Sequence, residues 1–163
     1  QEANQRTEIG HWETDNIEGV KTSTEAISIA VDRKTTFAKM DKLLTKKPKE
    51  KSDSLISQFE KLPGNVAKTF TMDNGIENKN HEEIAAFLGC KTFFCNAYHC
   101  WEKGTVENTI GLVREYLPKG TDLTNITKGE INAIAWELNN RPRKKLGFKT
   151  PLEVFFKEAG WGT

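Results

Sequence analysis

The chain has 163 residues, of which 24 are Lys or Arg and 23 are Asp or Glu, so its net charge is +1. This length fits one domain with its own core, and the near-neutral charge excludes a uniformly basic nucleic-acid-coating protein and an acidic solvating tail. Four Trp and nine Phe argue against disorder, and no apolar run approaches the roughly 18 residues of a membrane span.

The first third of the chain predicts strands. Residues 11–15 alternate, placing Trp12 on one face and Glu13 and Asp15 on the other. Residues 27–40 read as a hairpin, because a period-2 apolar pattern is followed by a polar turn and a second short strand.

The middle of the chain predicts a helix over 55–62 that stops at a Pro-Gly pair, then a short strand over 68–72. Asn80 and Glu83 have the spacing of a capping box, and Gly89 is placed to close the helix that they open.

The last third predicts one more strand, over 91–98, and then three helices. The first helix has apolar positions from Val106 to Leu117. The second begins at Thr127 and the third at Thr150, each with a Glu three residues later. This order of elements predicts a three-layer α/β domain around a mixed sheet.

Several other residues indicate packing rather than chemistry. Trp136 and Trp161 are expected to be packing residues on helices. The cysteines occur at five-residue steps, which is neither a Cys-x-x-Cys pair nor a disulfide framework. They predict small apolar side chains and a reducing, intracellular compartment. They are Cys90, Cys95 and Cys100. The histidines are too dispersed for a zinc set. They are His11, His81 and His99.

Charge is segregated along the chain. Residues 1–32 hold seven acids and two bases, whereas residues 33–51 hold eight bases and two acids. A second basic stretch, residues 141–149, contains no acid. Such stretches are usually solvated faces, but they are also where phosphates would be attracted.

Three carboxylates occupy positions that suit metal-dependent phosphoryl transfer. Asp15 lies on an early predicted strand, Asp73 ends a later one, and Glu107 lies in the first turns of a helix, with 33 residues separating the last two. Hard oxygen ligands from three elements could hold two Mg²⁺ ions about 3.5–4 Å apart.

The helix that carries Glu107 adds a second indication. Glu107, Gly111 and Arg114 share a stripe beside the apolar one. Arg114 could then contact a phosphate next to the metals, while Gly111 would let a nucleic-acid backbone approach. Spacing alone leaves other interpretations open, because Asp73-Asn74-Gly75 is an ordinary turn sequence and an acid near a helix start is favourable without any catalytic role.

Longer motifs in the chain give a specific resemblance to a known family. From residue 10 to residue 155, nearly the whole chain resembles bacterial insertion-sequence transposases of the insertion-sequence-thirty type. The three blocks that carry it are Gly10-His11-Trp12-Glu13-Thr14-Asp15, Met72-Asp73-Asn74-Gly75 and Trp101-Glu102-Lys103-Gly104-Thr105-Val106-Glu107-Asn108. The likeness continues through Pro118-Lys119-Gly120-Thr121, Leu138-Asn139-Asn140-Arg141-Pro142-Arg143-Lys144 and Thr150-Pro151-Leu152-Glu153.

The resemblance implies a ribonuclease-H-like, retroviral-integrase-type core with a five-stranded mixed sheet flanked by helices. It implies that Asp15, Asp73 and Glu107 are both the catalytic and the metal-ligating residues of a DDE transposase. The cofactor would be Mg²⁺, with Mn²⁺ as a substitute and two ions expected. The implied reaction is cleavage at transposon ends followed by strand transfer into target DNA.

The implied partners are transposon-end and target DNA and further copies of the chain in a synaptic complex, in the bacterial cytoplasm at the nucleoid, with no membrane. We expect DNA contacts from Lys103, Asn108, Arg114, Arg141, Arg143 and Lys144. We expect residues 1–163 to be one catalytic core taken from a longer protein, because the chain lacks an initial Met and the helix-turn-helix region that the family uses to read transposon ends.

Two departures from the family pattern are visible. His99-Cys100 stands where the family usually has Ser-Pro, and Lys103 stands where Arg is common, which keeps the charge but loses the planar fork. Two other functions remain open at this point. One is an inactivated or domesticated core that only binds DNA, and the other is a nuclease of the ribonuclease-H or junction-resolving type.

Overall fold

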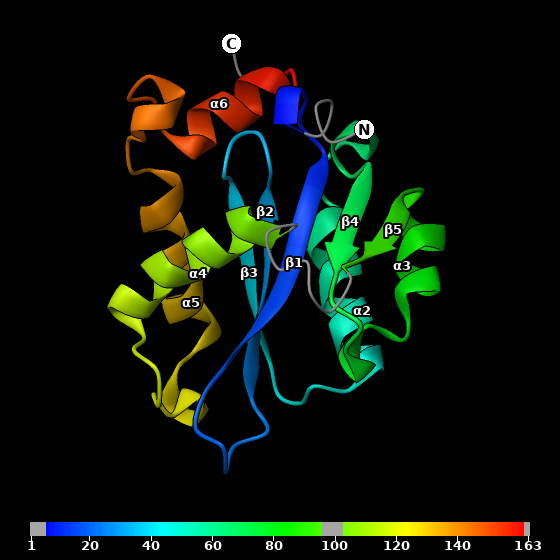
Figure 1. The fold of residues 1–163 in the computed structure, drawn as a ribbon, viewed down its shortest axis with the longest axis vertical. Coiled ribbons are helices and arrows are strands. Elements are labelled where there is room, and N and C mark those ends of the chain that lie inside the picture. Colours follow the sequence, from blue (N-terminus) through cyan, green and yellow to red (C-terminus); the bar gives the residue numbers. More distant parts are fainter. Residues whose placement is uncertain (1–5, 96–102, 162–163) are drawn as a thin grey trace.

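The computed structural model describes residues 6–95 and 103–161 of the chain, and within them five strands form one mixed sheet. The order across the sheet is β3-β2-β1-β4-β5. The strands are β1 (His11–Glu18), β2 (Ala26–Asp32), β3 (Ala38–Leu43), β4 (Thr69–Met72) and β5 (Lys91–Phe94). Strands β1, β2 and β3 are antiparallel neighbours, whereas β1, β4 and β5 run parallel. The mixed sheet expected from the sequence is therefore confirmed (Figure 1).

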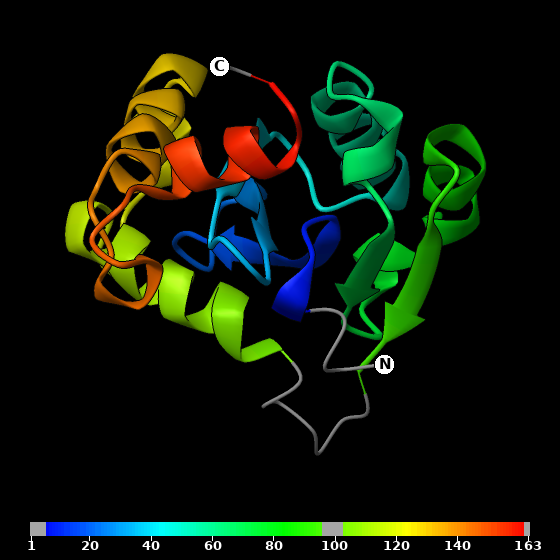
Figure 2. The same cartoon turned by 90° about the horizontal axis from the view of Figure 1, so that it is seen from above.

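Helices cover both faces of this sheet. The helices are α2 (Pro48–Phe59), α3 (His81–Leu88), α4 (Gly104–Tyr116), α5 (Lys128–Asn139) and α6 (Pro151–Glu158). Helices α4 and α5 enclose one core with the aliphatic side of β2, and α2, α3 and α6 enclose a second, aromatic core. Figure 2 shows α4 and α2 on opposite sides of the strands. None of the described helices is both long and apolar enough to cross a membrane.

The two cores explain why β2 is buried along its whole length. Ile27, Ile29 and Val31 pack toward α4 and α5, while Ala30 belongs to the aromatic core on the other side. A strand covered on both faces has no solvent-facing side, so the alternation visible in the sequence separates two cores rather than core from solvent.

The helix boundaries are confirmed where the signals are local. Thr127 accepts a hydrogen bond from the Glu130 amide, and Thr150 and Glu153 form a capping box. Gly89 closes α3 with φ +64°, a conformation that costs glycine little. The capping box expected at Asn80 is wrong, because the Asn80 side chain makes no cap bond.

Other expectations need correction. Glu83, the second residue of the expected box, instead accepts a hydrogen bond from Lys49 Nζ at 3.2 Å. The strand expected over 91–98 ends at Phe94, and residues 96–98 lie outside the described part. Trp136 is wrongly predicted as a packing residue, because 63% of it is exposed. Trp161 does pack, stacking on Phe156, but it follows the end of α6.

Candidate active site

Strands β1 and β4 separate just before the two aspartates. They pair in parallel only over His11–Glu13 of β1, whereas β1 stays paired with β2 as far as Glu18. Asp15 therefore lies beyond the last β1–β4 pair, and Asp73 directly follows the end of β4 at Met72. Crevices at the carboxyl ends of parallel strands are where ligands bind in open α/β sheets. The fold thus brings the two expected acids together where β1 and β4 part.

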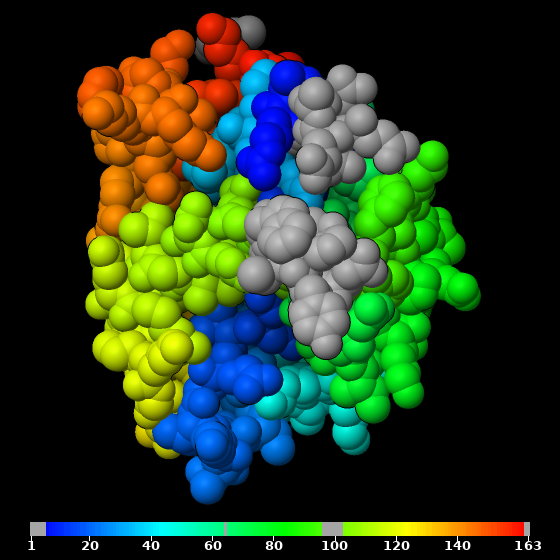
Figure 3. Space-filling view, in the orientation of Figure 1, coloured from blue at the N-terminus to red at the C-terminus, as the bar shows by residue number. Residues whose placement is uncertain are grey.

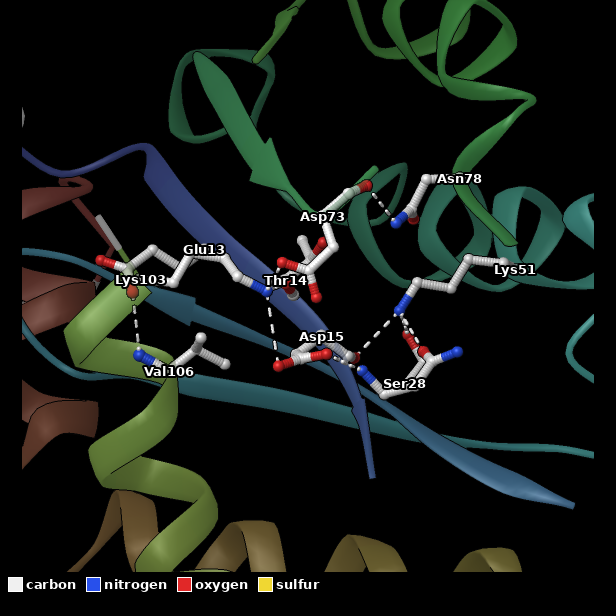
Figure 4. A network of polar contacts seen from close by, with 10 residues as sticks. Glu13, Thr14, Asp15, Ser28, Lys51, Asp73, Asn78, Lys103 and Val106 are labelled. Carbon is white, nitrogen blue, oxygen red and sulfur yellow. Dashed lines mark hydrogen bonds and ion pairs between the residues drawn. The ribbon is translucent and has the colours of Figure 1, made fainter. Parts of the chain in front are cut away.

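A buried ammonium joins these two acids. Lys103 Nζ lies 2.8 Å from Asp73 Oδ1 and 3.4 Å from Asp15 Oδ2, and it donates a hydrogen bond to the Thr14 carbonyl oxygen at 3.1 Å (Figure 4). Burial alone would lower the pKa of Lys103, but the hydrogen bond to Asp73 and the charges of both aspartates raise it above its ordinary value. Lys103, which the sequence predicts to contact DNA, contacts both carboxylates here, and its contact with DNA stays a prediction.

Glu13 fixes the start of α4 against β1. Its carboxylate accepts a hydrogen bond from the Val106 amide at 3.0 Å and another from Arg33 Nε at 2.8 Å, and the side chain is fully buried. An amide in the first turn of a helix has no partner within the helix, so this carboxylate satisfies a group that would otherwise be orphaned. The alternation of β1 places Glu13 on the face of Asp15, but sequence reasoning gave it no role.

Lys51 supports Asp15 from the opposite face of the sheet. Its ammonium donates to the Asp15 carbonyl oxygen at 3.0 Å, to Asn16 Oδ1 at 2.6 Å and to Ser28 Oγ at 2.8 Å. The Asp15 carbonyl lies where β1 has already left β4, so the lysine takes the place of a strand neighbour. Burial lowers the pKa of Lys51 from 10.5 to about 7, against the charges of Asp15, Glu77 and Asp73, which raise it.

The buried role of Lys51 is not predicted from the sequence, because this residue lies in the basic stretch 33–51. Such a stretch predicts a solvated or phosphate-attracting face. One signal could have found it. Lys51, Leu55 and Phe59 follow one another at four-residue steps, which places the lysine on the buried stripe of α2.

Glu107 is exposed in the first turn of α4. Within residues 6–95 and 103–161, no three acidic, His or Cys side chains are grouped so that they could hold a metal ion. The structure therefore joins Asp15 to Asp73 through Lys103 and does not bring Glu107 into the same cluster. The role of Glu107 stays a prediction.

Arg114 is engaged at the far end of α4. Its guanidinium donates to the Glu18 carbonyl oxygen at 3.1 Å and to the Leu117 carbonyl oxygen at 3.3 Å, which ties α4 to the end of β1. Arg141 donates to the Tyr116 hydroxyl at 2.9 Å and lies 3.6 Å from a Glu115 carboxylate oxygen.

The remaining residues expected at DNA fall into two groups. Asn108 and Arg143 line one cavity, whereas Lys144, the residue after Arg143, is exposed.

His99 and Cys100, the departure from the family pattern, lie outside the described residues. Cys90 and Cys95 are buried, as expected of small apolar side chains. His11 bonds Glu8 and Thr69, and His81 packs on Phe94.

Comparison with known proteins gives consistent relatives, although no family model matches the chain. The chain is 41% identical over 149 residues to the transposase InsI of insertion sequence element IS30A from Escherichia coli (strain K12), covering 91% of this chain and 38% of that protein. It is 43% identical over 147 residues to the transposase of element IS4351 from Bacteroides fragilis, covering 90% and 44%. The chain thus spans less than half the length of these relatives.

Solved structures share the fold at low sequence identity. The catalytic core domain of BIV integrase superposes with a TM-score of 0.72 at 16% identity, covering 93% of this chain and 96% of that one. A chain of the simian T-cell lymphotropic virus intasome gives a TM-score of 0.73 at 16% identity, covering 90% and 54%. The fold expected from the sequence, that of a retroviral integrase core, is confirmed.

Proposed function

The chain is homologous to part of the transposases of the IS30 type and has the fold of a retroviral integrase catalytic core, and we propose that it is the catalytic core of a DDE transposase. The observation that carries the proposal is the pair of aspartates at the parted ends of β1 and β4, with one buried cation between them. We propose that Asp15, Asp73 and Glu107 are the catalytic acids and that DNA is the substrate.

The donor set suits a divalent metal. Asp15 and Asp73 offer carboxylate oxygens, the ligands that Mg²⁺ prefers, and the two carboxylates lie close enough together to share the ammonium of Lys103. With Glu107 as the third ligand, bound Mg²⁺ or Mn²⁺ would polarise the scissile phosphate and stabilise the charge on the attacking and leaving oxygens.

The proposed reaction has two steps of the same kind. Water attacks a phosphorus atom at the transposon end, the bond to the 3′-oxygen breaks, and that oxygen takes a proton to become a 3′-hydroxyl. The 3′-hydroxyl then attacks a phosphorus atom of target DNA, releases its proton, and displaces the target's 3′-oxygen.

The protein's own part in both steps is positioning. Glu13 holds α4 on β1, and Lys51 holds the Asp15 backbone. In the absence of metal, Lys103 is the counter-ion of the two aspartates. We further propose that copies of the chain assemble around the DNA ends, as the intasome neighbour suggests.

Substitution of Asp73 tests this function. We expect Asp73→Asn to abolish the Mn²⁺-dependent conversion of supercoiled plasmid to open circles by about a thousandfold or more, because such metal contacts contribute several kcal/mol. Asp53→Asn removes an exposed acid that pairs with Lys49 on α2, so it makes the same charge change away from Asp15 and Asp73 and should leave cleavage unchanged.

Three results separate the candidate functions. Cleavage by Asp73→Asn at the rate of the unmodified chain would refute the proposal. DNA binding that is indifferent to metal, with no cleavage, would indicate an inactivated core. Preferential degradation of an RNA–DNA hybrid, without strand transfer, would indicate a ribonuclease-H-type nuclease.

A further inference from the structure

A cavity of about 270 Å³ opens between the start of α4, the β2–β3 turn and the basic segment after α5. Its polar lining includes three cations and several uncharged hydrogen-bonding groups. These are Arg6, Arg143, Lys145, Asn108, Thr36 and Thr105. The elements that carry them are far apart in the sequence and meet on the face of the molecule seen in Figure 3.

The cations in this cavity are not neutralised by its lining, which contains no acidic residue. Burial lowers the pKa of Arg143, as does the charge of Arg141. Burial also lowers the pKa of Lys145, and the charges of Arg143 and Arg6 lower it further, while those of Asp32 and Glu13, which do not line the cavity, raise it. Like charges gathered in a partly enclosed space repel one another, and an anion bound among them would relieve that repulsion.

Arg143 presents a second, independent sign of a ligand. Its Nε and Nη2 atoms are buried, and neither has a hydrogen-bond partner among the described residues. Buried guanidinium donors without acceptors are costly, whereas a phosphate accepts two parallel bonds from such a fork. The start of α4, at Gly104 and Thr105, adds the positive end of a helix to the same wall.

We propose that this cavity binds a backbone phosphate of the DNA on which the chain acts, an inference that rests on the proposed function. None of the lining residues is aromatic or a large apolar residue, so the cavity offers mainly charge and hydrogen bonds, which suit a phosphate better than a base. Asn108 directly follows Glu107 on α4, so a phosphate in the cavity would fix the register of the strand presented to the acids.

The salt dependence of DNA binding tests the cavity directly. Each phosphate contact contributes about 0.9 to the slope of log K against log salt concentration. We expect Lys145→Gln to reduce the steepness of that slope by about this amount and to weaken the binding of a fluorescein-labelled duplex several-fold. Arg143→Gln should have the same effects. Lys91→Gln removes an exposed charge on β5, away from the cavity, and serves as the matched control.

A second measurement separates DNA from free phosphate. In NMR titrations, the duplex should shift the amides of Thr105 and Asn108 at micromolar concentration, and inorganic phosphate should do so only at millimolar concentration. Equal response to both ligands, or an unchanged slope in a folded Lys145→Gln variant, would overturn the inference. If Asp73→Asn still cleaved DNA while Lys145→Gln lowered the slope, the proposed function would fail and the cavity would stand.

Discussion

Asp15 lies between two buried lysines that approach it from opposite faces of the sheet. On the α4 face, Lys103 contacts the carboxylates of Asp15 and Asp73. On the α2 face, Lys51 contacts only uncharged oxygens, among them the backbone carbonyl of Asp15. Burial acts in the same direction on both ammonium groups, yet the pKa of Lys103 is raised and that of Lys51 falls to about 7.

The difference has two causes: Lys51 is the more deeply buried of the two, and only Lys103 contacts carboxylates that offset the effect of burial. Lys103 is a counter-ion, so another cation could replace it between the same carboxylates. Lys51 is a hydrogen-bond donor, and even its neutral form could keep donating to the β1 backbone. We interpret the α4 face as the exchangeable side of the site and the α2 face as its fixed support.

The α4 face also contains a buried ion pair whose loss should be costly. Glu13→Gln removes the negative charge that pairs with Arg33 and weakens the acceptor of the Val106 amide. Breaking a buried ion pair from one side typically costs about 3–5 kcal/mol. We therefore expect the free energy of unfolding, measured by urea denaturation, to fall by about that amount.

Glu18→Gln is the control for this variant, since it lies on the same strand. Glu18 pairs with Lys46 at the surface, with 63% of its side chain exposed. Such exposed pairs contribute about 0–1 kcal/mol. Equal losses in the two variants would show that Glu13 is not a special anchor of α4.

On the α2 face, Lys51→Met should change both stability and its pH dependence. Between pH 7 and 10.5 the unfolded chain keeps a proton that folded Lys51 has lost, so the free energy of unfolding of the unmodified chain should rise with pH across that window. The variant should lose the part of this rise that Lys51 contributes and keep only the part from lysines such as Lys39 and Lys145, whose pKa values are also lowered. Because the variant also leaves oxygens of Asp15, Asn16 and Ser28 without a donor, at about 1–3 kcal/mol for each unsatisfied group, its deficit should be largest near pH 9.5.

Urea denaturation from pH 6 to 9.5 in EDTA measures this effect, and Lys47→Met is the matched control. Lys47 is exposed just before α2, so its substitution should leave the pH profile parallel to that of the unmodified chain. A Lys51→Met profile that rises as steeply as that of the unmodified chain would mean that Lys51 does not titrate in this window.

Features that depend on interactions between residues close together in the sequence could be predicted, and features that depend on distant residues could not. Alternation in β1 and the end of β4 placed Asp15 and Asp73 correctly, because strand period and strand ends are local properties. The caps at Thr127 and Thr150 were found for the same reason. Such signals act within a few residues of the chain.

The roles of the two lysines could not be predicted in this way. Lys51 acts on a carbonyl 36 positions away in the sequence, and Lys103 on one 89 positions away. Trp136 was misassigned because its exposure depends on what the rest of the fold covers, which its own helix does not reveal. Asn80 is a residue type that often caps helices, but its side chain makes no cap bond. Glu83, the partner expected for it, accepts a hydrogen bond from Lys49 on another helix.

The smallest predicted effect tests the exchangeable character of the α4 face. Lys103→Met removes the ammonium that a divalent ion would have to displace from Asp15 and Asp73. We expect Mn²⁺ to bind this variant about tenfold more tightly in calorimetry, equivalent to about 1.4 kcal/mol, while the metal-free variant unfolds more easily because its two carboxylates lack a counter-charge. Lys51→Met, which changes the other face, should not tighten Mn²⁺ binding. Weaker binding by Lys103→Met would instead make the lysine a support for the bound metal, and the two faces would then differ in chemistry but not in role.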